Sequence, residues 1–177
     1  MRQLTLLLSL FIMVLFAKEP QVIHGHQLPP EPDPLVNDST LLGIDANGNG
    51  VRDDVEIWIL NKYKDKHPIH IDIAMQVGRA WQKVLEDPSK AKETTKYMDS
   101  AQECEAYYYV YAKYFQKLIL VQERINDGKF NFVVLNNQQR KEGYLIYDAL
   151  LSGDIYHNSR AELLKNKCDF NTTKYED

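Results

Sequence analysis

Residues 45–56 carry oxygen-bearing side chains at alternating positions, in the order Asp-Ala-Asn-Gly-Asn-Gly-Val-Arg-Asp-Asp-Val-Glu. Calcium takes roughly six to eight oxygen ligands, and a loop of about twelve residues supplies them when its backbone turns sharply at the middle. Gly50 stands where this turn requires a positive φ, which a residue with a Cβ resists. The expected ligands are the side chains of Asp45, Asn47, Asn49, Asp53 and Glu56 and the carbonyl of Val51. The sequence therefore predicts one calcium site, in which Asp53 ligates directly or through a water and Glu56 ligates with both carboxylate oxygens.

The same segment resembles the calcium loop of the EF-hand superfamily. Two features look more like the loops of exported bacterial calcium-binding proteins, of dockerin or thrombospondin type 3 kind. They are the Gly-Ile-Asp start at residues 43–45 and the Asn-Gly-Val-Arg-Asp-Asp run at residues 49–54. The resemblance implies calcium as the bound ion and the same six ligand positions. It is confined to residues 43–56. The rest of the chain resembles uncharacterised exported bacterial proteins, which implies no activity.

The loop is expected to be solitary. Paired hands usually carry an aliphatic or β-branched residue at the eighth loop position, whereas this loop has Arg52, and no other segment repeats its spacing of oxygens and glycine. Pro34 lies so close before Asp45 that the incoming side has room for about two helical turns. We therefore expect a short or absent incoming helix and a loop that is fixed against its own domain.

Beyond the loop, the apolar periodicity predicts an all-α fold, a bundle of four to five helices over residues 35–170. The first expected helix begins at Asp53 and ends before Pro68. Three more are expected over residues 69–86, 90–126 and 132–151. A short last helix is expected to begin at a capping box at residues 159–162. Gly143 predicts that another helix, such as the tyrosine-rich one, comes close at that point.

One arc of the expected helix over residues 90–126 is apolar and rich in tyrosine. Its members are Cys104, Tyr107, Tyr108, Tyr111, Tyr114, Phe115, Leu118, Ile119 and Ile125. Aromatic faces also serve as sugar-binding or single-strand-stacking platforms, which is the alternative to a packing role. Confinement of the tyrosines to the apolar arc favours a core face.

The two ends of the chain differ in composition from the helical part. Arg2 precedes an apolar run that ends near Ala17, the layout of a secretory signal peptide over residues 1–17, with an uncleaved anchor as the alternative. Residues 18–34 hold five of the seven prolines and are expected to form an extended tether. A frayed tail is expected over residues 171–177.

Export would place the two cysteines, Cys104 and Cys168, in an oxidising compartment. An even count there predicts one disulfide, and two buried free thiols are the alternative. The chain is expected to be secreted or periplasmic, with no transmembrane segment after signal removal. Its net charge of −4 argues against a nucleic-acid partner, which needs a clustered basic face.

No residue is predicted to be catalytic. His67 and His70 have a spacing compatible with zinc, but Pro68 breaks the helix that would align them. The leading hypothesis is an exported helical protein in which calcium is structural and any protein partner is unidentified. Two alternatives stay open. One is a hydrolase whose cleft the calcium shapes, with His67, His70 or His157 among acids, and the other is an envelope interaction module with an exposed aromatic patch.

Overall fold

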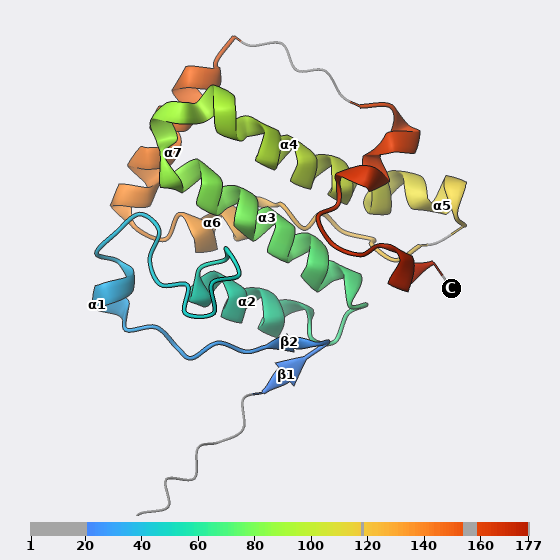
Figure 1. The fold of residues 1–177 in the computed structure, drawn as a ribbon, viewed down its shortest axis with the longest axis horizontal. Helices are drawn as coiled ribbons and strands as arrows, with labels where there is room; N and C mark the ends of the chain where they lie inside the picture. Colours follow the sequence, from blue (N-terminus) through green and yellow to red (C-terminus); the bar gives the residue numbers. More distant parts are fainter. Residues whose placement is uncertain (1–20, 118, 154–158, 177) are drawn as a thin grey trace, which may run out of the picture.

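The computed structural model describes residues 21–117, 119–153 and 159–176, and within these ranges it is built mainly of helices (Figure 1). The elements are, in chain order, β1 (Val22–Ile23), β2 (His26–Gln27), α1 (Pro34–Asn37), α2 (Asp53–Tyr63), α3 (Ile69–Glu86), the 3-10 turn η1 (Pro88–Lys90), α4 (Ala91–Ala106), the π-helical turn η2 (Tyr107–Tyr111), α5 (Ala112–Phe115), α6 (Gly128–Val134), α7 (Gln138–Leu151) and the 3-10 segments η3 (Ala161–Lys167) and η4 (Thr173–Tyr175). The all-α fold class is confirmed, with a small antiparallel hairpin added to it.

Helix α3 lies between α2 and α4, and α7 also packs against it (Figure 1). Buried side chains occur all around α3, the pattern of a helix enclosed by its neighbours. The apolar ones are Ile69, Ile71, Ile73, Ala74, Met75, Val77, Ala80, Trp81, Val84 and Leu85. As predicted, α3 begins directly after Pro68 and ends before Pro88, because proline is tolerated at a helix start and breaks a helix interior.

The tyrosine-rich helix is shorter than predicted. Helix α4 passes into η2, where the N–H of Ala112 donates to the carbonyl of Tyr107, and helical structure ends at Phe115 instead of near residue 126. The π-helical turn adds one residue to a turn, which rotates every later side chain by about 100°. The predicted core arc therefore holds for Tyr107 and Tyr108, which are buried, but fails for Tyr114 and Phe115, which are at least half exposed.

The chain after α5 returns to the core without regular structure. Lys117 has a φ of 57°, which no helix continues. The predicted core arc fails for Ile119, which is exposed, and its member Leu118 lies outside the described residues. Ile125 is buried, and its N–H donates to the buried Glu105 at 2.7 Å.

The helix predicted over residues 132–151 is two helices, α6 and α7. The side chain of Asn137 caps α7 by accepting from the N–H of Arg140, so the chain breaks before it. Gly143 does mark a close approach, but the neighbour is not the tyrosine-rich helix. A Cβ at this position would lie 3.3 Å from Cγ of Pro88 and 3.4 Å from Cδ2 of Leu41. The glycine therefore lets α7 pack onto the turn between α3 and α4.

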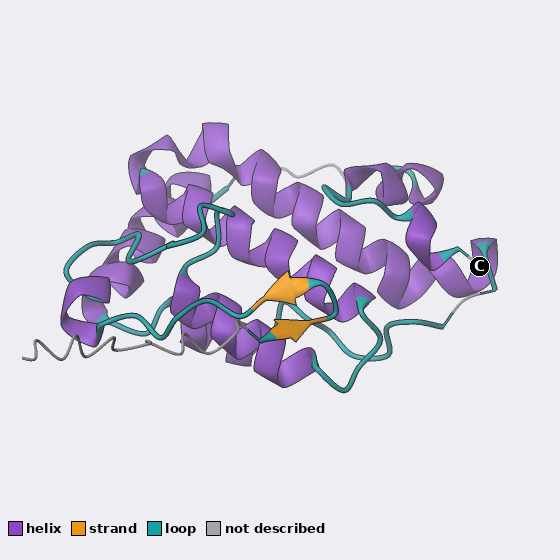
Figure 2. Ribbon diagram, turned by 60° about the horizontal axis from the view of Figure 1, so that its bottom comes forward, coloured by secondary structure: helices purple, strands orange, loops and turns teal. Residues whose placement is uncertain are grey.

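The N-terminal hairpin packs against the helices (Figure 2), so the prediction of an extended tether is wrong from residue 21 onward. Ile23 is buried, and Leu28 packs against the same core. Nε2 of His24 lies 2.8 Å from the carbonyl of Lys64. Burial of Ile23 and partial burial of Leu28 offset part of the entropy lost when this proline-rich segment becomes ordered.

The C-terminal segment is also ordered, so the prediction of a frayed tail is wrong. The hydroxyl of Tyr175 donates to the buried carboxylate of Asp72 at 2.6 Å, and Nζ of Lys174 lies 2.6 Å from the same carboxylate. Nε2 of His26 lies 3.0 Å from its other oxygen. Burial by itself raises the pKa of Asp72, but the bonds from His26, Lys174 and Tyr175 lower it to about 2. Asp72 therefore holds both ends of the described chain on α3.

The predicted disulfide between Cys104 and Cys168 is confirmed, with a Cα–Cα distance of 4.9 Å, and it joins α4 to the segment after η3. The predicted capping box is not formed. Both the N–H and the hydroxyl of Ser159 donate to the carboxylate of Glu103, at 2.7 and 2.9 Å. This serine is therefore engaged by α4, and the segment after it is a 3-10 helix instead of an α-helix.

The predicted signal peptide, residues 1–17, lies outside the described residues. Within the described part of the chain, no helix is both long and apolar enough to cross a membrane.

Replacing Asp72 with Asn is expected to lower the free energy of unfolding at pH 7 by roughly 2 kcal/mol, because three donors lose a charged acceptor. Its pKa is lower in the folded chain than in the unfolded chain. The contribution is therefore complete above about pH 5 and disappears as the pH falls towards about 2. Urea unfolding at pH 7 and pH 2.5 measures both effects. Asp65→Asn, at an exposed carboxylate, is the control. An equal loss in both variants would contradict this role.

Candidate functional site

The predicted calcium loop lies between α1 and α2, and its own side chains close it. The carboxylate of Asp45 accepts from the N–H groups of Asn49 and Gly50, at 3.2 and 2.8 Å. Gly48 and Gly50 have φ values of 68° and 82°, the region that the sharp turn requires. Helix α1 has four residues and ends well before Asp45, so the incoming helix is short, as predicted.

Three of the predicted ligand side chains meet inside the loop. Nδ2 of Asn47 and Nδ2 of Asn49 both donate to Oε2 of Glu56, at 3.1 and 2.8 Å. The amide oxygens of the same two residues accept from backbone N–H groups of the loop, at 3.0 and 2.9 Å. These local bonds fix the two amides beside the Glu56 carboxylate, which is the residue expected to close a calcium sphere.

Two carboxylates of the loop, those of Asp53 and Glu56, are buried and accept hydrogen bonds only from neutral groups among those described. Glu56 is 1% exposed and Asp53 is fully buried. Burial raises the pKa of both groups, and the bonds from Asn49 and Asn47 to Glu56, and from Ala46 to Asp53, offset the rise only in part. Carboxylates held in this way are stabilised by a cation, and hard oxygen donors suit calcium. A bound calcium ion would supply the positive charge that these carboxylates lack.

The protein side of such a site is not made of acids alone. Within the described ranges, no three His, Cys, Asp or Glu side chains form a group that could hold a metal by themselves. The three predicted carboxylate ligands, Asp45, Asp53 and Glu56, therefore do not form such a group, and a calcium site at this loop would also depend on amide and carbonyl oxygens.

Val51 anchors the loop to α3. Its side chain is fully buried, and a Cβ on Gly78 would lie 2.9 Å from Cγ1 of Val51. The absence of a side chain on Gly78 therefore makes the space that the loop occupies. Sequence reasoning did not single out Gly78, and the available signal was a glycine within a strongly apolar helix.

Arg52 attaches the loop to the end of α6. Its side chain is fully buried. The guanidinium donates to the carbonyls of Val133 and Val134 at the end of α6, at 3.1 and 3.3 Å, and to Asp54 at 2.5 Å. The loop is thus attached to the same domain that it begins, which agrees with a solitary loop.

A second buried guanidinium, that of Arg140 on α7, holds the segment that leads into the loop. It donates to the carbonyls of Asn37 and Leu41 at 2.5 and 3.0 Å and to the carboxylate of Asp38 at 2.7 Å. Burial lowers the pKa of Arg140, as does the nearby charge of Arg52, and the bond to Asp38 opposes both. Sequence reasoning missed this residue because nothing in its spacing separates it from a surface arginine.

Asn136, in the break between α6 and α7, joins the two guanidiniums. Its Oδ1 accepts from Arg140 at 2.6 Å and from Arg52 at 3.4 Å, and its Nδ2 donates to Asp54 at 3.1 Å. Gly43 packs against the same group with a φ of 68°, and a Cβ there would collide with the side chain of Arg52. The incoming and outgoing sides of the loop are therefore clamped to one helix junction.

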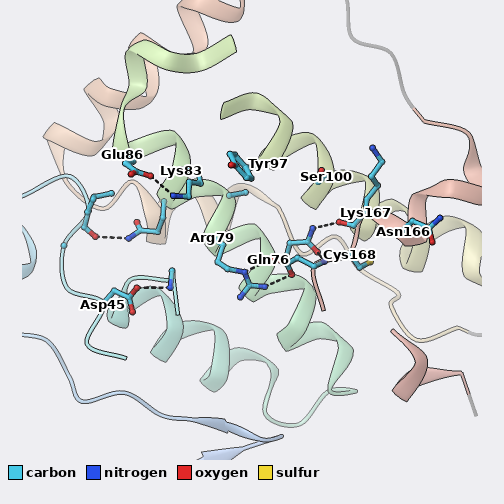
Figure 3. Close-up of a pocket in the computed structure, with 16 residues that line it drawn as sticks. Asp45, Gln76, Arg79, Lys83, Glu86, Tyr97, Ser100, Asn166, Lys167 and Cys168 are labelled. Atoms are coloured by element: carbon cyan, nitrogen blue, oxygen red, sulfur yellow. Dashed lines mark hydrogen bonds and ion pairs between the residues drawn. The ribbon is translucent and has the colours of Figure 1, made fainter. Parts of the chain in front are cut away.

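A cleft of about 750 Å³ lies beside the loop (Figure 3). Asp45 and Gly50 are among the residues that line one side of it, and α3, α4 and residues 166–169 supply the other walls. Arg79 forms two bonds with Asp169, at 2.8 and 2.6 Å, across this cleft. The side chain of Gln76 donates to the carbonyl of Lys167 at 2.8 Å, so the C-terminal segment is fixed along α3.

The histidines considered from the sequence do not assemble a zinc site in the described part of the chain. His67 and His70 line a hollow of about 460 Å³ together with Asp65 and Glu123. Nδ1 of His70 lies 3.0 Å from the carbonyl of His67, and burial lowers the pKa of both rings. His157 lies outside the described residues.

Comparison with protein-family models, with curated proteins and with solved structures finds no match to this chain. The geometry of the loop and its surroundings is therefore the basis for any functional conclusion.

Replacing Arg52 with Met is expected to destabilise the fold by roughly 3 kcal/mol, because two buried carbonyls and Asp54 lose their donor. Methionine keeps most of the side-chain volume, so the loss reports the guanidinium. Chemical denaturation monitored by circular dichroism measures it, and Arg124→Met, at an exposed arginine, is the control. A change within about 0.5 kcal/mol, the range of ordinary surface substitutions, would contradict the clamp.

Proposed function

We propose that this chain is an exported helical protein whose single EF-hand-type loop binds calcium, and that the ion mainly stabilises the fold. The observation that carries the proposal is the convergence of Asn47, Asn49 and the buried Glu56 carboxylate inside a loop that Asp45 closes. Two neutral side-chain amides donate hydrogen bonds to the carboxylate of Glu56. A divalent cation would supply the charge that this carboxylate lacks.

The surroundings of the loop favour a structural role over a switching role. Val51 is locked against Gly78 on α3, and Arg52 is bonded to the end of α6. A switch requires an element with two arrangements of similar free energy, and these buried contacts favour one arrangement. Calcium would then order the loop without moving the helices.

The expected affinity is that of extracellular modules, with a dissociation constant of about 10⁻⁴ to 10⁻³ M. At a concentration about ten times the dissociation constant, mass action adds about 1.4 kcal/mol to stability. The disulfide supports an exported chain, because such bonds persist in oxidising compartments where calcium is also available at this concentration.

A hydrolytic role for the cleft beside the loop has less support. Nucleophilic hydrolysis needs a base within hydrogen-bond reach of the nucleophile. The cleft lining includes Ser100 but no histidine, and Cys168 is held in the disulfide. We therefore assign the loop a stabilising role and propose no reaction.

Calcium is expected to raise the melting temperature of the full chain and to change the emission of Trp58, two residues beyond Glu56. The test is a titration of calcium-stripped protein to 10 mM, with Glu56→Gln as the variant and Glu123→Gln, at an exposed carboxylate, as the matched control. The response should be present in the control and weakened at least about tenfold in Glu56→Gln, which lacks the closing carboxylate. No response of either probe, or the same response in both variants, would contradict calcium binding.

Acidification is expected to weaken calcium binding, because protons compete for Glu56 and Asp53 at a higher pH than for ordinary carboxylates. In calcium-free protein the sign is opposite. A carboxyl whose pKa is raised on folding takes up its proton first in the folded chain, so these two groups stabilise the fold as the pH falls through that raised pKa. The measurement is the melting temperature with and without 5 mM calcium from pH 7.5 to 4.5. If the rise in melting temperature caused by calcium stays constant over this pH range, the prediction is contradicted.

A further inference from the structure

A second hollow, of about 450 Å³, lies between α3, α4 and α7. It shares no lining residue with the cleft beside the calcium loop. Its volume falls within the range of about 300–1,000 Å³ that small-molecule sites occupy. Trp81 from α3, Asp99 from α4, and Tyr144 and Asp148 from α7 are among the residues that line it.

Two residues of this hollow carry buried polar atoms without a hydrogen-bond partner in the described structure. Trp81 is 4% exposed, and its indole N–H has no acceptor. Oδ1 of Asn131 is likewise buried and has no donor. Buried polar groups in folded proteins are almost always paired, so an unpaired donor and an unpaired acceptor at one hollow mark a place where a molecule with both kinds of group binds.

The charge of the hollow is negative. Asp99 and Asp148 line it, and none of its lining residues is a lysine, an arginine or a histidine. Burial raises the pKa of Asp99, as does the charge of Glu103, and a bond from Thr95 and the charge of Lys167 oppose the rise. Two carboxylates without a cation in the lining favour a ligand that brings a positive charge.

The aromatic wall suits the same kind of ligand. The rings of Trp81 and Tyr144 have centroids 5.3 Å apart, and the rings of Tyr144 and Tyr147 lie 6.4 Å apart. Aromatic faces attract organic cations through the ring quadrupole and also pack against the apolar faces of sugar rings.

We propose that this hollow binds a small organic ammonium ion that also carries hydroxyl groups, an amino sugar or an amino alcohol. The ammonium group donates to Asp99 and Asp148, and rotations of the two side chains bring Oδ1 of Asn131 and the indole N–H of Trp81 to the polar groups of the ligand. The site is independent of the calcium loop, and binding is expected with and without calcium.

Glucosamine and glucose test the proposal directly, because they differ at one position, where an ammonium group replaces a hydroxyl. Isothermal titration of the full chain should give at least about tenfold tighter binding of glucosamine. Ethanolamine is the second probe, and it separates a need for the sugar ring from a need for the ammonium group. Equal binding of glucose and glucosamine, or no binding of glucosamine and ethanolamine up to 50 mM, would overturn the proposal.

Two variants separate the roles of the charge and of the indole N–H. Asp99→Asn should weaken glucosamine binding at least about tenfold, and Trp81→Phe, which keeps an aromatic face, should weaken it about three- to tenfold. Asp87→Asn, at a carboxylate outside this hollow, is the control. Circular dichroism establishes that each variant is folded. Unchanged glucosamine binding in both folded variants would overturn the proposal. If Asp99→Asn does not fold, unchanged binding in Trp81→Phe would overturn it.

Discussion

A guanidinium group can be removed from water only where its N–H groups find acceptors, and two such groups determine the architecture around the loop of residues 45–56. Arg52 and Arg140 are both fully buried. Their acceptors come from the segment before the loop, from α2, from the end of α6 and from Asn136 in the break between α6 and α7. Two stretches of the chain that lie far apart in sequence, residues 37–54 and 133–140, are therefore held in one relative position.

The hydrogen bonds of Arg52 give the eighth loop position a role within its own domain. In a paired hand the eighth position joins one loop to another, whereas here Arg52 joins the loop to the helix junction of its own domain. Asp72 likewise joins distant parts of the chain, because its carboxylate binds His26, Lys174 and Tyr175. Together with the disulfide, these groups fix the loop, the hairpin and the C-terminal segment around α3. A calcium ion in such a frame would add stability to one arrangement of the chain.

Much of this could be predicted from local sequence. The limits of α3 follow from Pro68 and Pro88, and the short incoming helix follows from Pro34, because proline acts on the backbone wherever it stands. The disulfide followed from the number of cysteines and the expected compartment. The prediction from helical periodicity failed at η2, because it assumes 3.6 residues in every turn and this turn holds one more. One extra residue in a turn moves Tyr114 and Phe115 off the core face, and no pattern in the residue types announces that turn.

The sequence by itself determined the oxygen donors of the loop, their spacing and the glycines that let the loop close, because these interactions span only a few residues. The tertiary structure alone decided which groups those donors meet and how deeply they are buried. Glu56 is 1% exposed in the folded chain, and this burial raises the pKa of its carboxyl group. Gly78 and Arg140, which make this possible, lie far along the chain, and their partners are fixed only when the helices pack.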